Sequence, residues 1–525
     1  MKIKSIMVVG GGSSGWMTAA KKKKKFGKDI KVSVIEGKNS NPVGVGESTI
    51  TKFNDYLTQI LGLEDKEWMP HCNATYKTSI RFTNFRDGNG EVFEYPFGGS
   101  HTEESFGAWS AARAKYNLGP DSFCEFMNHV YWLAKHNRMT TNSDNAIGFS
   151  FRGDTSYHFD ASLFGKFLKT RFCKKATHYI DDVVAVKKDE EGYITSLVGD
   201  SGTEYSADLY VDCTGFKSLL LEKEMGSEFI SFKPWLDNDR AIATHLPYKD
   251  KTKEIRNVTN CTALSSGWSW NIPLWNRMGS GYVYSSDFIS DDDAEKEFKQ
   301  HVGNEDIEIR KINIRHGVRE KGWVKNVVGV GLAFGFIEPL ESTGLVSTHE
   351  MIQQLVEILD RRNYNITGFD RDSYNYACQL VVTGYMYFVS LHYKLSQRSD
   401  TPYWKYQTEI KDWFKLSDPR LFTENKLHFS YENGSTVWYE NIHQFHSLAH
   451  RWDPEKNGIA YIMAGMGHVP YANYLYDLLK SGSKDTFEGD VDKTYRECKK
   501  YAKIIEEHVL KLPTSYEFLK ETIYS

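Results

Sequence analysis

Two carboxylates, two hydroxyl side chains and a glycine occur together in a short stretch of the segment 326–346. They are Glu338, Glu341, Ser342, Thr343 and Gly344. An apolar run precedes them and apolar residues at helical spacing follow, which predicts a strand, a turn and then a helix. Ser342 and Thr343 are typical helix caps, and a helix N-terminus attracts anions through its free N–H groups and its dipole. An anion site beside carboxylates is one interpretation, and a capped helix behind a loop is the other.

Lys77 is a second residue that could do chemistry. It lies in the segment 69–85, which has the pattern of a strand, among small and apolar neighbours. A lysine in such a strand often extends its stem so that the amine reaches water. The alternative is a partly desolvated ammonium with a lowered pKa, able to hydrogen-bond or to react with an electrophile. The sequence leaves both alternatives open.

A turn that binds a dinucleotide is predicted at the N-terminus. The strand 3–9 runs into Gly-Gly-Gly-Ser-Ser-Gly, a helix-forming segment follows, and a second strand, 31–35, ends in an acid. The glycines let the backbone close on a pyrophosphate at the helix N-terminus, and the acid can accept from a ribose hydroxyl. The predicted cofactor contacts here are Gly10, Gly12, Ser13, Ser14, Gly15 and Glu36.

Two further stretches favour FAD over NAD. A glycine-rich loop at 41–50 could lie across an isoalloxazine ring and hold it in place. A strand at 207–215 ends in D-x-T-G, which would bring a further strand end of the sheet to the cofactor. FAD lies extended across such a sheet, and with one G-x-G-x-x-G in the chain no second module for NAD(P)H is visible. The predicted contacts from these stretches are Gly44, Gly46, Glu47, Ser48, Thr49 and Asp212.

The composition narrows the class of protein. At 525 residues the chain is too long for one compact core, and its net charge of −4 gives no reason to expect nucleic acid or a membrane as a partner. Seven cysteines without a C-x-x-C pair suggest reduced thiols and a cytoplasmic location. The sequence indicates no export signal. It contains no run of about 18 uncharged apolar residues, so no membrane span is predicted. The 17 histidines show no metal-ligand spacing, so no metal is predicted.

Several motifs, in one order, make the chain similar to a known family. They are GGGSSGW (10–16), GVGEST (44–49), CNATYK (72–77), GWSWNIP (267–273) and GFIEPLESTG (335–344). Together they resemble the flavin-dependent halogenases, particularly the branch typified by the tryptophan halogenases. HYKLSQRSDTPYW (392–404) is similar to that family too, and the resemblance extends over nearly the whole chain.

The resemblance implies the cofactors and the reaction. FAD is supplied as FADH2 by a separate NAD(P)H-dependent flavin reductase, and O2 and a halide (chloride, bromide or iodide) complete the reagents. The product of these reagents is hypohalous acid, which moves through an internal passage to a second cavity and halogenates an electron-rich aromatic carbon. The resemblance also suggests a homo-oligomer.

The resemblance also implies roles for residues. The backbone near Thr343 and Gly344 holds the halide, and Lys77 hydrogen-bonds hypohalous acid or becomes a haloamine. Glu341 polarises the electrophile or takes the proton from the ring, and Ser342 connects the substrate site to the flavin. A screen between the flavin and the substrate is expected from the tryptophan strand, namely Trp268, Trp270, Ile272 and Pro273. Paired tryptophans on one strand face are equally typical of a protein core.

The substrate is less well determined. An indole, a phenol or a related heteroaromatic is expected, with free tryptophan as one candidate. Candidates to line the cavity are His101, Trp109, Trp452 and Tyr461. Two other functions stay open: an FAD-dependent aromatic monooxygenase, and a non-catalytic flavoprotein.

We expect an α/β fold with an FAD-binding Rossmann-like module of the glutathione-reductase type and a mostly helical substrate-binding cap. Residues 1–360 would form the FAD module, with substrate-side helices inserted at about 62–150 and β-rich connections, and residues 361–525 the helical substrate-binding region. Within the module, the sheet is expected to be assembled from 1–60, roughly 150–220 and 265–360.

Overall fold

The computed structural model describes most of the chain. The described residues are 1–20, 30–39, 46–98, 109, 112–113, 115–140, 148–174, 176–409, 458–467 and 484–525. Three of the predicted site residues, Gly44, His101 and Trp452, lie outside this part of the chain. Within the described part, no helix is both long enough and apolar enough to cross a membrane.

A six-stranded sheet is built from distant parts of the chain. Its strands, in spatial order, are β20 (Trp323–Val324), β21 (Val327–Gly329), β12 (Leu209–Asp212), β1 (Ser5–Val9), β2 (Lys31–Glu36) and β8 (Thr177–Ile180). All neighbours are parallel except the edge pair β20 and β21. Its central strands β12 and β1 are buried and mostly apolar, as is typical of parallel sheets.

Helices cover this sheet and bring the N-terminal turn against the segment 331–344. They are α1 (Ser13–Ala20), α8 (Ala161–Arg171) and α11 (Gly344–Arg361). Helix α1 packs on β1 and β2 and also contacts α8 and α11. The predicted α/β class with a Rossmann-like module is confirmed by this arrangement, and the strand, turn and helix predicted at 326–359 are found as β21, a short 3-10 turn at Pro339–Glu341 and α11.

A seven-stranded sheet stands beside the first. In spatial order it contains β18 (Arg310–Asn313), β14 (Arg240–Leu246), β17 (Met278–Tyr284), β16 (Gly267–Pro273), β15 (Val258–Leu264), β5 (Ser79–Thr83) and β6 (Val92–Pro96). Its pairs are antiparallel except β15 and β5. A small antiparallel sheet of β3 (Glu47–Ser48), β7 (Ser156–Phe159) and β4 (Thr75–Lys77) carries Lys77.

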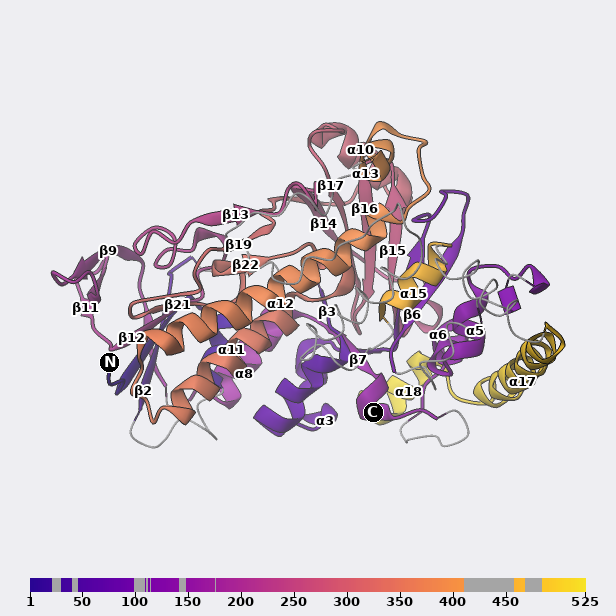
Figure 1. The fold of residues 1–525 in the computed structure, drawn as a ribbon. Coiled ribbons are helices and arrows are strands. Elements are labelled where there is room, and N and C mark those ends of the chain that lie inside the picture. The colour runs from indigo at the N-terminus through magenta and orange to yellow at the C-terminus, as the bar shows by residue number, and fades with distance from the viewer. Residues whose placement is uncertain are drawn as a thin grey trace.

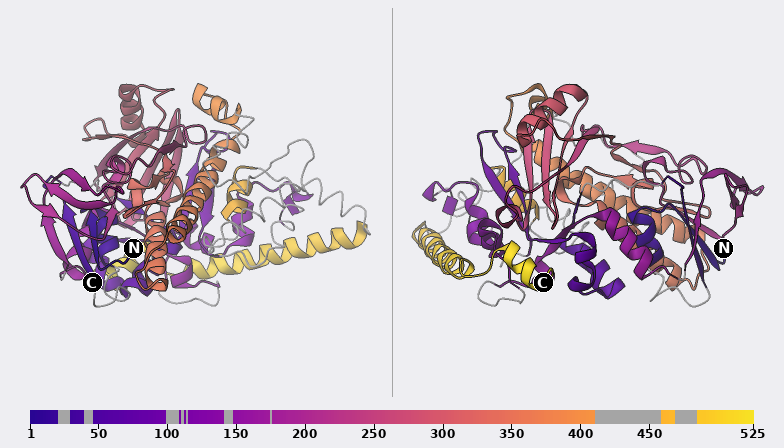
Figure 2. Two further views of the ribbon diagram at one scale, coloured as in Figure 1. Left: turned by 60° about the vertical axis from the view of Figure 1, so that its left-hand side comes forward. Right: turned by 180° about the vertical axis from the view of Figure 1, so that it is seen from behind.

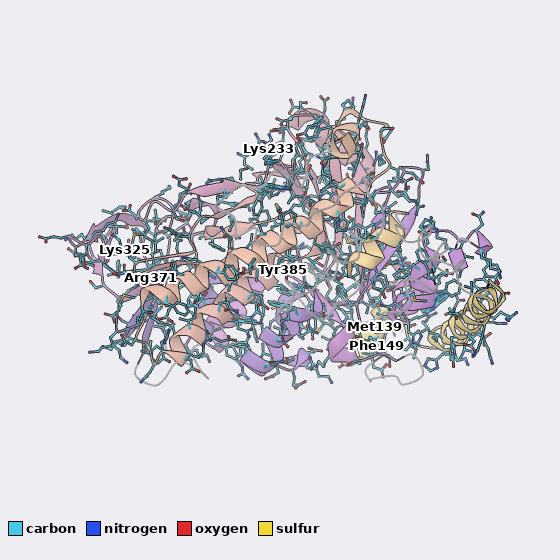
Figure 3. The ribbon with its side chains drawn as sticks, viewed as in Figure 1. Met139, Phe149, Lys233, Lys325, Arg371 and Tyr385 are labelled. Carbon is cyan, nitrogen blue, oxygen red and sulfur yellow. The ribbon has the colours of Figure 1, made fainter. Side chains whose placement is uncertain are left out.

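Helix α12 (Gly368–Lys394) runs from one large sheet to the other (Figure 1). At its start Tyr374 donates to the carbonyl of Gly329, at the end of β21. Arg371 lies near this end and Tyr385 at the centre of the molecule (Figure 3). Because its far end reaches the seven-stranded sheet, α12 places side chains from residues 385–394 between the two sheets.

The remaining elements are mostly short. They are α3 (Asp65–Trp68), α5 (Ser122–Met127), α6 (Val130–His136), α7 (Phe151–Asp154), α9 (Lys251–Glu254), α10 (Asp291–Val302), α13 (Pro402–Glu409), α15 (Gly458–Gly465), α17 (Lys484–Val509), α18 (Ser515–Thr522), β9 (Val183–Lys188), β10 (Ile194–Gly199), β11 (Glu204–Tyr205), β13 (Phe229–Ser231), β19 (Gly317–Arg319) and β22 (Gly335–Phe336). Figure 2 shows α17 as a long helix at the edge of the molecule, and α5 and α6 lie on the same side. The predicted division of the chain at residue 360 stays a prediction.

Candidate functional site

Lys77 is completely buried. It ends β4, which pairs with β7, and its side chain has no exposed surface. Its Nζ donates to the carbonyl of Thr49 at 3.0 Å and to Oγ of Ser342 at 2.9 Å, and it lies 4.9 Å from the centre of the Phe97 ring. The amine therefore does not reach water, and its lowered pKa and its reactivity stay predictions.

The helix start at Gly344 differs from the predicted cap. Thr343 is at the N-cap position of α11 but makes no side-chain cap bond, and Ser342 has φ +58° and directs its hydroxyl to Ser48 at 3.0 Å. Neither hydroxyl therefore caps the helix. The hydroxyl of Ser342 is instead hydrogen-bonded to Lys77 and Ser48. The first-turn N–H groups of a helix have no intrahelical acceptors. Without a side-chain cap or an acid in this first turn, they remain suited to a small anion.

Glu341 lies on the other side of the same turn and approaches His392 of α12. Its Oε1 is 2.7 Å from Nε2 of His392, and both side chains are buried. The Nδ1 atom of His392 lies 3.1 Å from the carbonyl of Val389, so that nitrogen carries a proton and donates. The second oxygen, Oε2, has no hydrogen-bond donor among the described residues. Burial raises the pKa of Glu341, whereas His392 and Lys77 act to lower it.

Glu47 brings a second carboxyl group to the start of α11. A Cβ atom added to Gly344 would lie 3.4 Å from its Oε1, so the carboxyl group is beside the first helical residue. Burial raises the pKa of Glu47 to about 7, and the nearby charge of Lys77 opposes that rise. Its charge therefore changes near neutral pH, next to the predicted halide site.

The two tryptophans lie on one face of β16, as alternation predicts. The rings of Trp268 and Trp270 are 6.1 Å apart and buried. Trp268 donates to Oε2 of Glu338 at 3.1 Å, which ties the strand to the 338–344 turn. Opposite Trp270 stands Gly281, where an added Cβ would lie 2.1 Å from the indole, so only glycine leaves room for this ring.

The remaining residues of this strand contact the two segments around Lys77. The side chain of Ile272 lies beside Gly46, since a Cβ on that glycine would be 3.5 Å from Ile272 Cγ2. The carbonyl of Pro273 accepts from the hydroxyl of Thr75 at 2.6 Å. The strand therefore supports both the 46–49 loop and β4.

The N-terminal turn fits a pyrophosphate. Gly10 has φ +119°, and an added Cβ would lie 2.3 Å from the carbonyl oxygen of Cys213, while one on Gly15 would lie 1.9 Å from the carbonyl oxygen of Gly10. In contrast, a Cβ on Gly12 would meet nothing within 4 Å, so the space in front of the helix N-terminus is open. That pattern, two glycines required by close packing and one facing open space, matches a phosphate cradle.

The side chains of Ser13, Ser14 and Glu36 contact protein groups around the turn. The Ser13 hydroxyl donates to the carbonyl of Ala161, and the Ser14 hydroxyl lies against Gly331, so both offer a cofactor their backbone N–H groups. Glu36 Oε2 lies 2.9 Å from His178 Nε2 and 3.2 Å from Lys169 Nζ. Its other oxygen is beside Gly11, within the turn.

Three predicted cofactor contacts have side chains that already make hydrogen bonds within the protein. The hydroxyls of Ser48 and Thr49 are buried and point into the protein, where they bind Thr259 and Ser156 at 2.8 and 2.7 Å. The N–H of Thr49 bonds to Tyr157 and its carbonyl to Lys77, so no polar atom of Thr49 is left for a cofactor. Each carboxylate oxygen of Asp212 already accepts two hydrogen bonds, from the turn at 214–221. We assign these side chains to structural support.

Two of the predicted cavity residues belong to one aromatic cluster. Tyr461 and Trp109 are both buried and both contact Phe123, with ring centres 5.1 and 5.0 Å apart. Tyr461 also lies 5.9 Å from Tyr95. Tyr95 contacts Phe97, the ring under Lys77. The cluster therefore links α15 and α5 to the amine of Lys77.

Comparison with known proteins decides among the functions left open by the sequence. The family described as tryptophan halogenase matches residues 5–472.

This chain belongs to the tryptophan halogenase family.

It is 36% identical over 403 residues to the 7-chloro-L-tryptophan 6-halogenase KtzR of Kutzneria sp. (strain 744), a match that covers 72% of this chain and 77% of that protein. The apo structure of VirX1 is similar over 100% of this chain and 99% of its own, with a TM-score of 0.89 and 43% identity. The tryptophan 6-halogenase SttH of Streptomyces toxytricini has a TM-score of 0.80 and 30% identity, with 98% and 99% covered.

The chain is therefore a flavin-dependent halogenase, an enzyme that halogenates an aromatic substrate with FADH2 and O2. The monooxygenase and the non-catalytic flavoprotein, both open from the sequence, give way to this function. Within this halogenase, sequence reasoning missed three polar residues of the site: His158, Thr259 and His392. Their spacing carries no motif, since they lie on β7, β15 and α12 and meet Lys77 and Glu341 only after folding. His392 begins a motif used for the resemblance, but that motif suggested no role for it.

Proposed function

We propose that this halogenase passes halogen from hypohalous acid to an indole- or phenol-type aromatic ring through the amine of Lys77. The observation that carries the proposal is the complete burial of Lys77 between the flavin-side loop at 46–49 and the turn at 338–344. Burial disfavours the charged form of an amine, and the neutral form is the nucleophile. Burying an amine costs free energy that burying a hydrophobic side chain would not cost. The burial of Lys77 therefore favours a chemical role over a structural one.

The cofactor would lie along the N-terminal turn. The backbone of Gly10, Gly12 and Gly15 and the start of α1 would hold the pyrophosphate of FAD, with Glu36 on the ribose. When bound as FADH2, delivered by a separate NAD(P)H-dependent reductase, the flavin supplies with O2 the oxidising power that converts halide to hypohalous acid. Trp268 and Trp270, locked by Glu338 and Gly281, would keep water and substrate away from it.

The chain's own groups would perform the transfer. The N–H groups at Thr343 and Gly344 would bind the halide. The neutral amine of Lys77 would attack hypohalous acid, forming an N–halogen bond and releasing water. The aromatic carbon would then take the halogen while the N–halogen electron pair returns to nitrogen. The nitrogen takes up a proton and is again an amine, and the proton lost by the ring balances this uptake. Oε2 of Glu341 would accept the ring proton, since within the described chain it has no other donor.

The substrate would lie in the region lined by the aromatic cluster. Tyr461 and Trp109 supply flat apolar surface near Phe97 and Lys77, which suits a stacked indole or phenol. His101 and Trp452 remain predicted lining residues. We also propose that the helical region predicted at 361–525 contributes to this site through α15, because α15 contacts β6 and α5.

A panel of aromatic compounds tests the proposal. The enzyme is incubated with FAD, NADH, a generic flavin reductase, air and bromide, and each reaction is analysed by mass spectrometry. Free tryptophan, other indoles and phenols form the panel. We expect a monobrominated product, with the bromine isotope doublet, from at least one indole or phenol. An oxygenated product that forms without halide would contradict the proposal.

Halide binding is expected to weaken as pH rises through about 7, because Glu47 ionises there beside Gly344. Below that pH the carboxyl group of Glu47 is neutral and does not repel a halide. Above that pH its negative charge repels the halide. The measurement is the apparent KM for bromide from pH 6 to pH 8.5 in the native enzyme and in Glu47→Gln. We expect about a tenfold rise in the native enzyme and none in the variant. An equal rise in both would show that another group titrates.

A further inference from the structure

An unbroken line of buried polar groups leads away from Lys77. Nζ of Lys77 donates to Ser342 at 2.9 Å, and Ser342 donates to Ser48 at 3.0 Å. The line continues from Ser48 to Thr259 at 2.8 Å and from Thr259 to Nε2 of His158 at 2.8 Å. From Nδ1 of His158 it reaches Thr75 at 3.2 Å and ends at the carbonyl of Pro273 at 2.6 Å. Each hydroxyl and the imidazole are at most 5% exposed, so water does not interrupt the line.

The two ends of the line determine its direction. The carbonyl of Pro273 can only accept, so the single hydroxyl proton of Thr75 is committed to it. Thr75 must then accept from His158, which places a proton on Nδ1. Burial holds the pKa of His158 well below its ordinary value, so the ring is neutral. A neutral ring with its proton on Nδ1 has an acceptor at Nε2.

Each hydroxyl upstream is then committed in turn. Thr259 donates to Nε2 of His158, so it can only accept from Ser48. The proton of Ser48 is used on Thr259, and Ser48 therefore accepts from Ser342. Ser342 has no second proton to give, so it faces Lys77 only as an acceptor.

We propose that His158 and Thr259 are positioning residues that prevent Ser342 from donating to Lys77. This inference rests on the proposed role of Lys77 as the group that takes up halogen. A neutral amine has one lone pair, and a hydroxyl that donates to it would occupy the electrons needed for attack on hypohalous acid. Because every hydroxyl proton along the line is already used, Ser342 has none to donate to the amine. The amine therefore remains the donor in its hydrogen bond to Ser342. Sequence motifs give no sign of this arrangement, because its members come from five strands and one turn.

Paired substitutions at Thr259 test the proposal. Thr259→Val removes the hydroxyl at nearly constant volume, which frees the proton of Ser48 and hence that of Ser342. Thr259→Ser keeps the hydroxyl and is expected to restore the line. We expect kcat for halogenation to fall about tenfold in the valine variant, because about tenfold in rate is the usual effect of one hydrogen bond. KM for the aromatic substrate should be unchanged. The serine variant should stay within about twofold of the native enzyme. Thr262→Val, on the opposite face of β15, is the matched control and should not change kcat.

Substitutions of His158 test the direction of the line. Glutamine places an amide oxygen at the position of Nε2, where Thr259 can donate to it, whereas asparagine offers a polar group only at the position of Nδ1. We expect His158→Gln to retain much more kcat than His158→Asn. Nitrogen-15 NMR of the histidine-labelled enzyme, with His158→Gln as the assignment control, should show the proton on Nδ1. A proton on Nε2 would overturn the proposal.

The result for Lys77 separates the two hypotheses. If Lys77→Met loses halogenation while Thr259→Val retains native kcat, the positioning role is wrong and the proposed function stands. If Lys77→Met retains halogenation, the proposed function itself fails. Equal losses in Thr259→Val and Thr259→Ser, together with equal losses of melting temperature, would show that packing alone requires threonine and would also overturn the positioning role.

Discussion

Replacing Lys77 with methionine is expected to reduce aromatic halogenation by about a thousandfold or more, the range that removal of a covalent catalytic group produces. Methionine keeps the length and the apolar stem of the side chain but offers no nitrogen to take up halogen. The amine is completely buried and contacts Thr49, Ser342 and the ring of Phe97, so no other described amine replaces it at this position. The measurement is product formation per FADH2 consumed, by mass spectrometry with bromide.

The same experiment shows whether the loss is specific. Binding of FAD and the rate of FADH2 oxidation should be unchanged, since the N-terminal turn lies between β1 and α1 whereas Lys77 ends β4. Loss of the donor leaves two buried acceptors unpaired and should cost about 1–3 kcal/mol of folding stability, so melting curves are measured in parallel. Lys394→Met is the matched control. Burial lowers the pKa of Lys394 to about 7, and its amine donates to Gln407, outside the site. Native halogenation by Lys77→Met would contradict the proposal.

Glu341→Gln is expected to lower kcat for halogenation by about a hundredfold to a thousandfold, the usual effect of losing a positioned general base. Glutamine has nearly the same shape, so packing against His392 is retained, but its amide cannot accept a proton from the ring. Within the described chain, Oε2 of the native carboxylate has no donor of its own and is therefore available to accept. The measurement is kcat with a substrate deuterated at the reacting carbon.

The isotope effect distinguishes the two roles that the carboxylate could have. If Glu341 takes the ring proton, proton loss becomes rate-limiting in Glu341→Gln and a primary deuterium isotope effect appears there but not in the native enzyme. If it polarises the electrophile instead, kcat falls without an isotope effect. A variant with native kcat would remove Glu341 from the mechanism.

Local sequence patterns were sufficient wherever a feature depends on neighbouring residues. The glycine turn at 10–15, the alternation that places Trp268 beside Trp270, and the helix that begins at Gly344 all follow from spacing within a few residues, and the structure confirms each. The family and the α/β class followed from motifs in a fixed order. These features are local because backbone conformation and the period of apolar residues are local properties.

The tertiary structure decided which polar atoms remain available. Ser48, Thr49 and Asp212 stand in stretches typical of cofactor binding. The hydroxyls of Ser48 and Thr49 are nevertheless bonded to distant segments, and the carboxylate of Asp212 is bonded to the turn that follows it. Conversely, no sequence pattern near His158 or His392 indicates a role in the site. Folding brings His158 to Thr259, in the line of hydrogen bonds that leads to Lys77, and brings His392 to Glu341. A side chain has only a few hydrogen-bonding positions, and burial forces each of them to find a partner. Which partner it finds depends on segments that lie far apart in the chain, 294 residues apart for Ser48 and Ser342. The sequence therefore determined the kind of site, and the fold determined its hydrogen bonds.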